Sequence, residues 1–195
     1  VFMAVRGDGS QKWPQTQLGG EDYDYFQEAL VDAAGKVWLF GSTLSVNGSS
    51  DFWLVPVAAT GKAETPITYG SAGTTEVACD AAVLASGFVL VGGTGGDGYA
   101  VFTSAEGTQK GQARTYGGAA NDLLYRVAVA PHGGMAMAGT SKSFGDPKGD
   151  GYLVRTDATG ELLWQKTYGG PGEDYFQGLV AMPDGRFLLV WYEAD

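Results

Sequence analysis

Short apolar runs alternate with polar, glycine-containing turns along the whole chain. Residues 37–40 and 187–190 are two such runs, and each follows a turn with a glycine, Gly35 or Gly185. Runs of about 4–8 residues between turn signals are typical of strands, because a helix that buries one face needs a longer amphipathic segment. The pattern therefore predicts an all-β chain built from antiparallel hairpins.

The apolar runs belong to a repeat with a period of roughly fifty residues. Its clearest mark is a Tyr-Gly or Leu-Gly step whose glycine stands at position 19, 70, 117 or 169. A first strand, a glycine turn, a second strand, a loop, a third strand that starts at an aspartate, and a fourth strand follow each step. Each unit is thus predicted to be a four-stranded antiparallel meander. The complete units span residues 19–69, 70–116 and 117–168.

The second strands share a feature at their ends. Three of them are expected to end at a glycine, namely Gly41, Gly92 and Gly139, whereas the fourth has Trp191 at that position.

The two ends of the sequence complement each other. Residues 169–195 supply only the first two strands of a unit, and residues 1–18 supply two strands in excess. Joining Asp195 to Val1 recreates the pattern of the other third strands, in which an aspartate precedes an aromatic residue by two positions, here Phe2. We expect 169–195 and 1–18 to form one unit together. The whole chain, 1–195, is then a single four-bladed β-propeller closed by two N-terminal strands, which leaves no sheet edge uncovered.

Three segments carry a family resemblance: WQKTYGG at 164–170, GEDY at 172–175 and GDGYLVRTD at 149–157. They resemble the repeat of secreted bacterial and archaeal surface β-propellers, and the similarity extends over all four units. The resemblance implies an exported chain, located extracellularly, in the periplasm or on the outer cell surface. Most members have no assigned activity. The second unit departs from the pattern, with Thr75 in place of the aspartate and Thr65-Pro66-Ile67 in place of the tryptophan-containing strand.

Composition narrows the choice of partner. The formal net charge is −10 and the isoelectric point is near 4.4, so binding to nucleic acid or to an anionic membrane surface is disfavoured. No apolar run approaches the eighteen residues of a membrane span, so we expect no membrane insertion. The only cysteine, Cys79, has no partner for an internal disulfide and is expected to be a small buried residue.

Two sets of carboxylates recur with the repeat and are expected at the same end of the propeller. Both sets are weak binding candidates. One set starts first strands and the other starts third strands: Asp24, Asp122 and Asp174; Asp51, Asp97, Asp150 and Asp195. An aspartate after a turn accepts hydrogen bonds from nearby backbone N–H groups, and we expect this structural role here. Calcium at this acidic face is the alternative, although no segment has the dense carboxylates of a calcium loop. We therefore expect no cofactor, no metal site and no catalytic residue.

Other side chains add little catalytic chemistry. The single histidine, His132, aligns with the turn at 183–185 and is predicted to lie at an exposed hairpin tip. Most aromatic residues in repeat register are expected to pack between blades. Trp191 and Tyr192 are the exceptions, because they lie where the other units have glycine, and they are weak binding candidates for a glycan.

The sequence thus predicts a non-catalytic exported propeller that mediates protein–protein contact, either as an adhesion module or as an accessory subunit of a larger complex. Loops 42–50 and 141–149 are the expected contact surface. A carbohydrate-binding, lectin-like propeller is the alternative. A metal-dependent hydrolase that uses the acidic face is a second alternative.

Overall fold

The computed structural model describes residues 1–46 and 48–193, and within them every regular element is a β-strand. The chain divides into two compact units, Val1–Ala78 and Cys79–Asp195.

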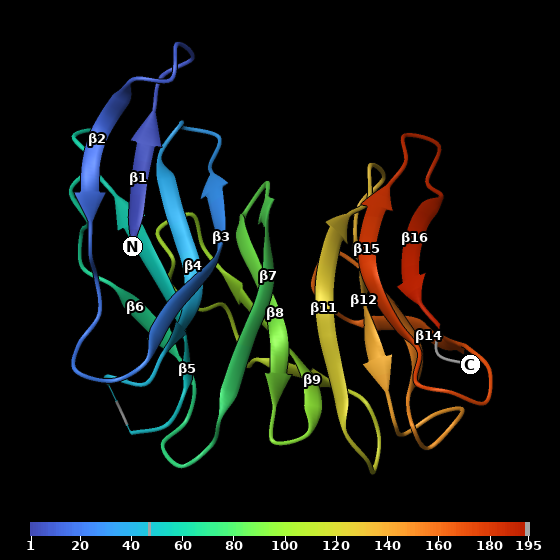
Figure 1. The fold of residues 1–195 in the computed structure, drawn as a ribbon. Coiled ribbons are helices and arrows are strands. Elements are labelled where there is room, and N and C mark those ends of the chain that lie inside the picture. Colours follow the sequence, from blue (N-terminus) through green and yellow to red (C-terminus); the bar gives the residue numbers. More distant parts are fainter. Residues whose placement is uncertain (47, 194–195) are drawn as a thin grey trace. The chain divides into compact units, whose positions relative to one another are not determined.

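The first unit contains a hairpin and a complete four-stranded sheet (Figure 1). The hairpin forms a two-stranded antiparallel sheet, and the other strands pair in chain order. The strands are β1 (Phe2–Val5), β2 (Gln11–Thr16), β3 (Asp24–Val31), β4 (Val37–Thr43), β5 (Asp51–Val57) and β6 (Ile67–Tyr69).

The core of the first unit lies between the hairpin and the four-stranded sheet. Trp13 of β2 is buried against Leu39 of β4 and against Trp53 and Val55 of β5. Phe26 of β3 stacks on Trp53 with ring centroids 4.8 Å apart. The hairpin β1–β2 is therefore held to the sheet by apolar contacts between their faces, the arrangement by which sheets bury their apolar sides.

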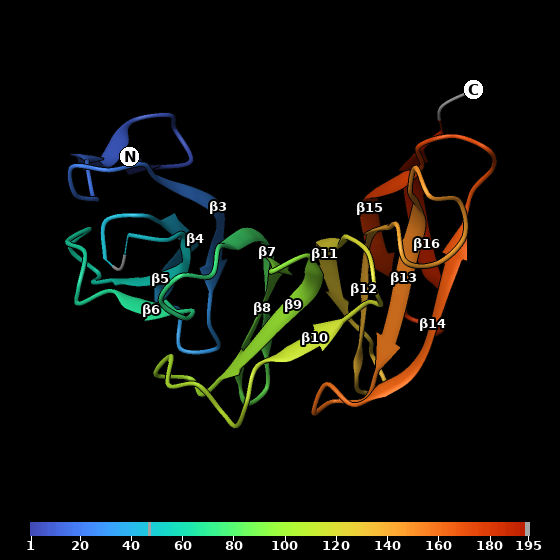
Figure 2. The ribbon, with the colours of Figure 1, turned by 90° about the horizontal axis from the view of Figure 1, so that it is seen from below.

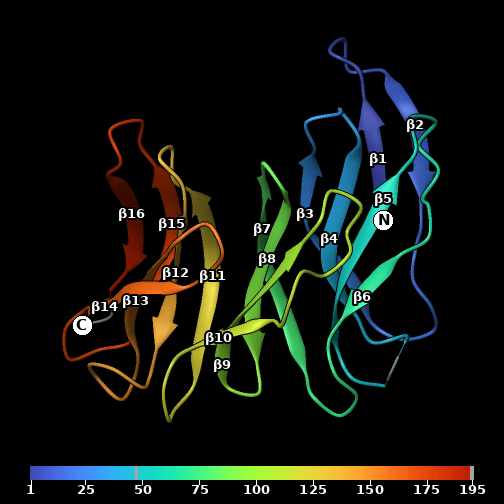
Figure 3. The same cartoon turned by 180° about the vertical axis from the view of Figure 1, so that it is seen from behind.

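The second unit contains two complete four-stranded sheets and a second hairpin (Figures 2 and 3). All pairings in these sheets join strands that are consecutive in the chain. The strands are β7 (Glu76–Leu84), which begins in the first unit, β8 (Gly87–Thr94), β9 (Asp97–Thr103), β10 (Arg114–Tyr116), β11 (Asp122–Val129), β12 (Met135–Ser141), β13 (Asp150–Thr156), β14 (Leu162–Tyr168), β15 (Tyr175–Ala181) and β16 (Phe187–Tyr192).

Two apolar clusters hold the second unit together. One cluster joins the sheet β7–β10 to the sheet β11–β14, with Val91, Leu124 and Tyr152 buried in it. The other joins the hairpin β15–β16 to the preceding sheet, with Phe176 packed against Ala138 and Leu153. Each sheet of this unit thus packs face to face on the next.

The second strands do not end at their glycines, and that prediction is wrong. β4 continues past Gly41 to Thr43, and β12 continues past Gly139 to Ser141. A Cβ on Gly41 would collide with the carbonyl oxygen of Tyr25, and one on Gly139 with that of Leu123. Beside each glycine the first strand carries a bulge, which brings its backbone this close. Glycine is required by this close approach and does not mark the end of the strand.

The strand register shows which strands of a complete four-stranded sheet each of the two hairpins corresponds to. In the complete sheets an aromatic residue of the third strand faces a threonine of the fourth: Trp53 faces Thr68, Tyr99 faces Thr115 and Tyr152 faces Thr167. In β1–β2, Phe2 faces Thr16 in the same way.

The hairpin β15–β16 instead carries the bulge of a first and second strand, between Phe176 and Gly178. The prediction of an all-β chain made of four-stranded antiparallel sheets is confirmed, and the two hairpins match complementary halves of such a sheet.

Candidate functional site

Aspartates at the start of first strands close the glycine turns before them. Oδ2 of Asp24 accepts a hydrogen bond from the N–H of Gly20 at 2.8 Å, and Oδ2 of Asp174 accepts one from Gly170 at 2.8 Å. Asp122 binds the N–H of Gly118 at 2.9 Å in the same manner. The structural role predicted for these three residues is confirmed, because the repeated carboxylate satisfies the same backbone donor each time.

Serine hydroxyls tie the loops after the second strands to these carboxylates. Ser45 donates a 2.8 Å hydrogen bond to Oδ2 of Asp24, and Ser143 donates one of 2.6 Å to Oδ2 of Asp122. Partial burial opposes ionisation of Asp24, but hydrogen bonds from Thr43, Gly20 and Ser45 together lower its pKa. The predicted contact loops are thus anchored where they begin, and their role in binding stays a prediction.

Carboxylates from the third strand of one sheet and the first strand of the next meet beside the glycine of the Tyr-Gly step. A Cβ on Gly117 would lie closer than 3.0 Å to both Oδ2 of Asp122 and Oδ1 of Asp97. A Cβ on Gly169 would approach both Oδ2 of Asp174 and Oδ1 of Asp150 as closely.

The same arrangement recurs at Gly70, where the neighbours are Asp51 and Glu76. We call Asp51–Glu76, Asp97–Asp122 and Asp150–Asp174 the carboxylate pairs. The two predicted sets of aspartates thus come together in the second unit, whereas in the first unit Asp51 meets Glu76, which belongs to neither predicted set.

Glu76 belongs to a carboxylate pair, but the alignment of the repeat units did not indicate it. The repeat aligns Thr75 with the aspartates, and Thr75 is exposed. The next residue, Glu76, is 2 % exposed and brings Oε2 to the position that an aspartate oxygen has elsewhere. A glutamate one position after the aligned site has one more methylene group than an aspartate, so its carboxylate reaches the same place. The presence of this glutamate beside Thr75 was the signal that the sequence offered.

The carboxylate pairs are buried to different degrees. Asp174 is fully buried and Asp150 is 7 % exposed, whereas Asp97 is half-buried. Burial and the charge of Asp122 raise the pKa of Asp97 above its ordinary value. Asp195, predicted to start a third strand like Asp51, Asp97 and Asp150, lies outside the described residues.

The aromatic candidates Trp191 and Tyr192 are on the surface of the hairpin β15–β16, and they are 56 % and 47 % exposed. Tyr192 stacks on Tyr175 with ring centroids 5.1 Å apart. A largely apolar hollow of about 370 Å³ lies beside Trp191. Its lining residues are Tyr168, Gly169, Phe176, Leu189, Trp191 and Glu193. By contrast, Trp53 and Tyr152 are buried, as the packing hypothesis predicts.

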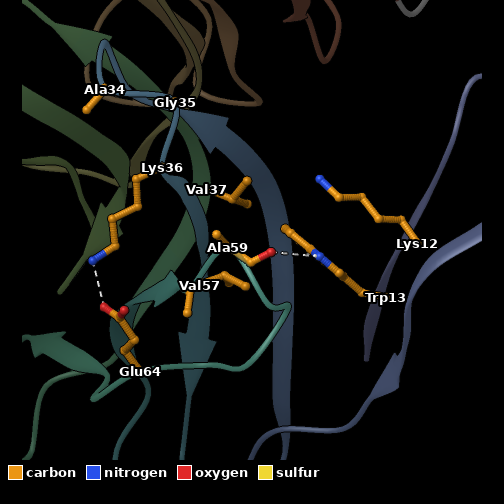
Figure 4. A pocket seen from close by; sticks show the side chains of 10 residues that line it. Lys12, Trp13, Ala34, Gly35, Lys36, Val37, Val57, Ala59 and Glu64 are labelled. Atoms are coloured by element: carbon orange, nitrogen blue, oxygen red, sulfur yellow. Dashed lines mark hydrogen bonds and ion pairs between the residues drawn. The ribbon is translucent and has the colours of Figure 1, made fainter.

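A second hollow, in the first unit, was not indicated by any motif (Figure 4). It measures about 410 Å³ and has Lys12 and Trp13 on one side and the Lys36–Glu64 ion pair on the other. The indole N–H of Trp13 donates a 3.2 Å hydrogen bond to the carbonyl of Ala59, which holds the ring in place. The indole N–H of Trp13, Lys36 and Glu64 thus all have partners at the edge of this hollow.

The outer strand β14 differs from its counterparts in the other sheets. It has seven residues, whereas β6 and β10 have three each and β2 is interrupted by Pro14. Leu162, Leu163 and Trp164 of β14 are all exposed. Sheets usually protect such edges by shortness, proline or charge. Among the fourth strands of the described units, β14 is therefore the longest, and it contains no proline.

Two remaining predictions concern single residues. His132 lies exposed in the turn between β11 and β12, as predicted. Cys79 of β7 is only partly buried. Desolvation by this burial raises the pKa of the thiol to about 11. The sequence predicted a small buried residue at this position, and the structure corrects this to partial burial.

Comparison with known proteins returns no relative: no family model matches the chain, and no curated protein matches it either. Among the described residues, no three or more histidine, cysteine, aspartate or glutamate side chains are grouped so that they could hold a metal ion. Nor does this part of the chain contain a helix with the length and apolarity needed to cross a membrane.

Proposed function

We propose that the chain is a closed four-bladed β-propeller that acts as a non-catalytic, exported protein-binding module, and that β14 is its contact edge. The single observation that carries the binding proposal is the long, proline-free edge of β14 with its exposed apolar side chains. The proposal has two parts, closure of the ring and recognition at the edge.

Closure is supported by the registers of the two hairpins. β15–β16 has the bulged pairing of a first and second strand, and β1–β2 has the aromatic–threonine pairing of a third and fourth strand. Trp191 has the same place in its strand as Gly139 has in β12. In that complete sheet Gly139 faces Tyr152, the aromatic residue of the third strand. Pairing β16 with β1 in this register places Phe2 opposite Trp191. A closed sheet of this kind removes two strand edges.

The hollow beside Trp191 gives closure a second support. Phe26, the counterpart of Phe176, stacks on the third-strand aromatic Trp53. Phe2 is the corresponding aromatic of the proposed fourth blade and would stack on Phe176 from the same side. The apolar lining then becomes core, which offsets the exposure of Trp191.

Recognition at β14 is proposed to occur by strand addition. An extended segment of another protein pairs with the free backbone groups of a sheet edge, and alternate side chains provide specificity. Leu163 is 57 % exposed and Trp164 also reaches the surface, so the edge offers apolar contacts on both faces. The occupant we propose is an extended partner segment with alternating apolar residues.

A phage-displayed library of random linear peptides, selected on the immobilised protein, tests this proposal. We expect enriched peptides with apolar residues at every second position, bound with a Kd of about 1 mM to 1 μM. Binding should be at least about 10-fold weaker to Leu163→Lys, because a charge on the edge opposes strand addition.

Val31→Lys is the matched control, since Val31 is an equally exposed apolar strand residue in another sheet. Equal binding of the selected peptides to Leu163→Lys would contradict the proposal. Concentration-dependent dimers in light scattering that vanish in Leu163→Lys would instead assign the edge to a second copy of the chain.

Glycan binding is a second candidate, favoured by the exposed rings of Trp191 and Tyr192 beside an apolar hollow. It competes with closure for the same surface. A glycan array probed with the wild-type protein and with Trp191→Ala decides between them. Signals that disappear in Trp191→Ala support the lectin, and no signal across a broad array removes it.

A further inference from the structure

The hollow in the first unit is lined by more positive than negative side chains, although the whole chain has a formal net charge of −10. Its charged lining residues are Lys12, Lys36 and Glu64. Lys36 is paired with Glu64, whereas Lys12 forms no ion pair with any described residue. The ammonium of Lys12 lies over the ring of Trp13, 5.2 Å from its centroid (Figure 4). One positive charge at this hollow is therefore available for an anion.

The wall beside Lys12 is already ordered. Trp13 is 9 % exposed, and its indole N–H donates a 3.2 Å hydrogen bond to the carbonyl of Ala59. A Cβ on Gly61 would collide with the indole, so the backbone at Gly61 packs directly against the ring. Val57, in the same apolar cluster as Trp13, is almost completely buried. A ligand thus meets a rigid apolar surface, which reduces the entropy cost of binding.

The available donors decide which kind of anion fits. Oδ1 of Asp32 accepts the N–H groups of Ala34 and Lys36 at 2.9 Å each, and the N–H of Gly35 donates to the carbonyl of Asp32. Phosphate sites rely on several free backbone N–H groups, and in this turn those groups are already engaged. A single ammonium is a suitable partner for one carboxylate.

We infer that this hollow binds a small carboxylic acid with an apolar ring, whose carboxylate pairs with the ammonium of Lys12. The volume of about 410 Å³ is in the range of pockets for small ligands. The apolar ring of the ligand packs against Val37 and Val57, which line the hollow together with Trp13. Glu64 is on the opposite side and repels the carboxylate, which orients the ligand (Figure 4). All of these residues belong to the first unit, so the site does not depend on ring closure or on the β14 edge.

Equilibrium dialysis of the full chain with phenylacetate tests the inference. We expect saturable binding with a Kd of about 0.1–10 mM, as for a small ligand with one charged contact. Phenylacetamide, which has the same shape without the charge, should bind at least about 5-fold more weakly. In a nitrogen–proton correlation spectrum, phenylacetate should shift the indole N–H signal of Trp13, which is identified by its absence in Trp13→Phe.

Lys12→Met keeps most of the apolar stem over Trp13 and removes the ammonium. It should bind phenylacetate at least about 5-fold more weakly, because the charge-assisted hydrogen bond is lost. Lys62→Met is the matched control, since Lys62 is an exposed lysine of the same unit that does not line the hollow. Its affinity should equal that of the wild type.

Absence of saturable phenylacetate binding by the wild type would overturn the inference. Equal affinity for phenylacetamide would also overturn it, because the hollow would then bind by apolar contact alone. Unchanged binding by Lys12→Met, with an unfolding temperature equal to that of the wild type, would reject Lys12 as the partner of the carboxylate.

Discussion

The hydroxyl of Ser143 donates a 2.6 Å hydrogen bond to the carboxylate of Asp122 and links the loop after β12 to the start of β11. The same oxygen accepts the N–H of Ala120 at 2.9 Å. Its single hydrogen, given to Asp122, leaves none for the nearby carbonyl of Ala120. One side chain thus satisfies a carboxylate and a backbone N–H at a place where two connections cross.

Replacing Ser143 by alanine is expected to lower the free energy of unfolding by about 1–3 kcal/mol, because it removes a charge-assisted hydrogen bond to the buried carboxylate of Asp122. Urea unfolding followed by fluorescence measures this. Ser10→Ala, in the exposed β1–β2 turn, is the control and should change stability by less than about 0.5 kcal/mol. An equal effect of both variants would contradict the linking role of Ser143.

Gly139 and Gly178 differ in the space around them, which gives a paired prediction. Gly139→Ala should destabilise the protein by about 1–3 kcal/mol, since the added Cβ collides with the carbonyl of Leu123. Gly178→Ala meets Val190 only at ordinary contact distance, 3.4 Å, and should be close to neutral. Thermal unfolding of the two variants compares them directly. If Gly139→Ala is as stable as the wild type, the close approach at the bulge is not rigid.

Asp97 makes stability depend on pH in a defined direction. Burial and the charge of Asp122 raise its pKa in the folded chain above 3.8. The folded state then holds the proton more tightly than the unfolded state. The resulting stability is fully present below the unfolded pKa and is lost as pH rises through the folded pKa.

Asp97→Asn lacks this loss. The free energy of unfolding of the wild type minus that of the variant should therefore fall as the pH rises above 3.8, the ordinary value for this carboxyl group. Urea unfolding at several pH values gives the difference. A difference that is flat or rises with pH would reject the assignment. Asp24, whose pKa is lowered, acts in the opposite sense, because its contribution is lost as pH falls through the folded pKa.

Ring closure predicts one particular disulfide. In the complete sheets the residue before the glycine faces the residue after the aromatic, as Ala138 faces Leu153. The corresponding residues of the proposed fourth blade are Val190 and Met3. Facing residues in antiparallel strands have Cα atoms about 4.5–5.5 Å apart, which a disulfide can span.

Met3→Cys with Val190→Cys, in a Cys79→Ser background, should therefore oxidise to an internal disulfide. Monomers of increased mobility on a non-reducing gel would show it. The pair Val5→Cys with Val190→Cys, displaced by two positions, is the control and should form less of it. Disulfide-linked dimers in place of monomers would mean that the strands pair between chains.

Much of the fold was accessible from the sequence, because strand periodicity and turn glycines are local signals. The first, second and third strands of the repeat begin close to where the pattern placed them, and the role of Asp24, Asp122 and Asp174 followed from their position after a turn. The role of Gly41 and Gly139 was misread. A glycine that ends a strand and one that admits a neighbouring backbone look the same in a sequence, since only the packed structure reveals the bulge beside it.

The candidate site was less accessible. Glu76 stands one position away from the aligned aspartates, and alignment by residue type overlooked it although its longer side chain reaches the same point. The exposed edge of β14 was also overlooked. The length of an exposed edge depends on how many residues of the fourth strand pair with the third strand, and this number is small in β6 and β10, which have three residues each.

By itself, the sequence determined the repeat, its strands and the turn residues, since these depend on contacts between residues close in the chain. Only the tertiary structure decided which carboxylates share a buried space, which glycines admit a backbone and which apolar residues stay on the surface. These properties depend on side chains brought together from different strands. Asp150, the first residue of β13, and Asp174 are separated in the chain by the rest of β13, by β14 and by two turns. The packing of one sheet on the next places them beside the same glycine.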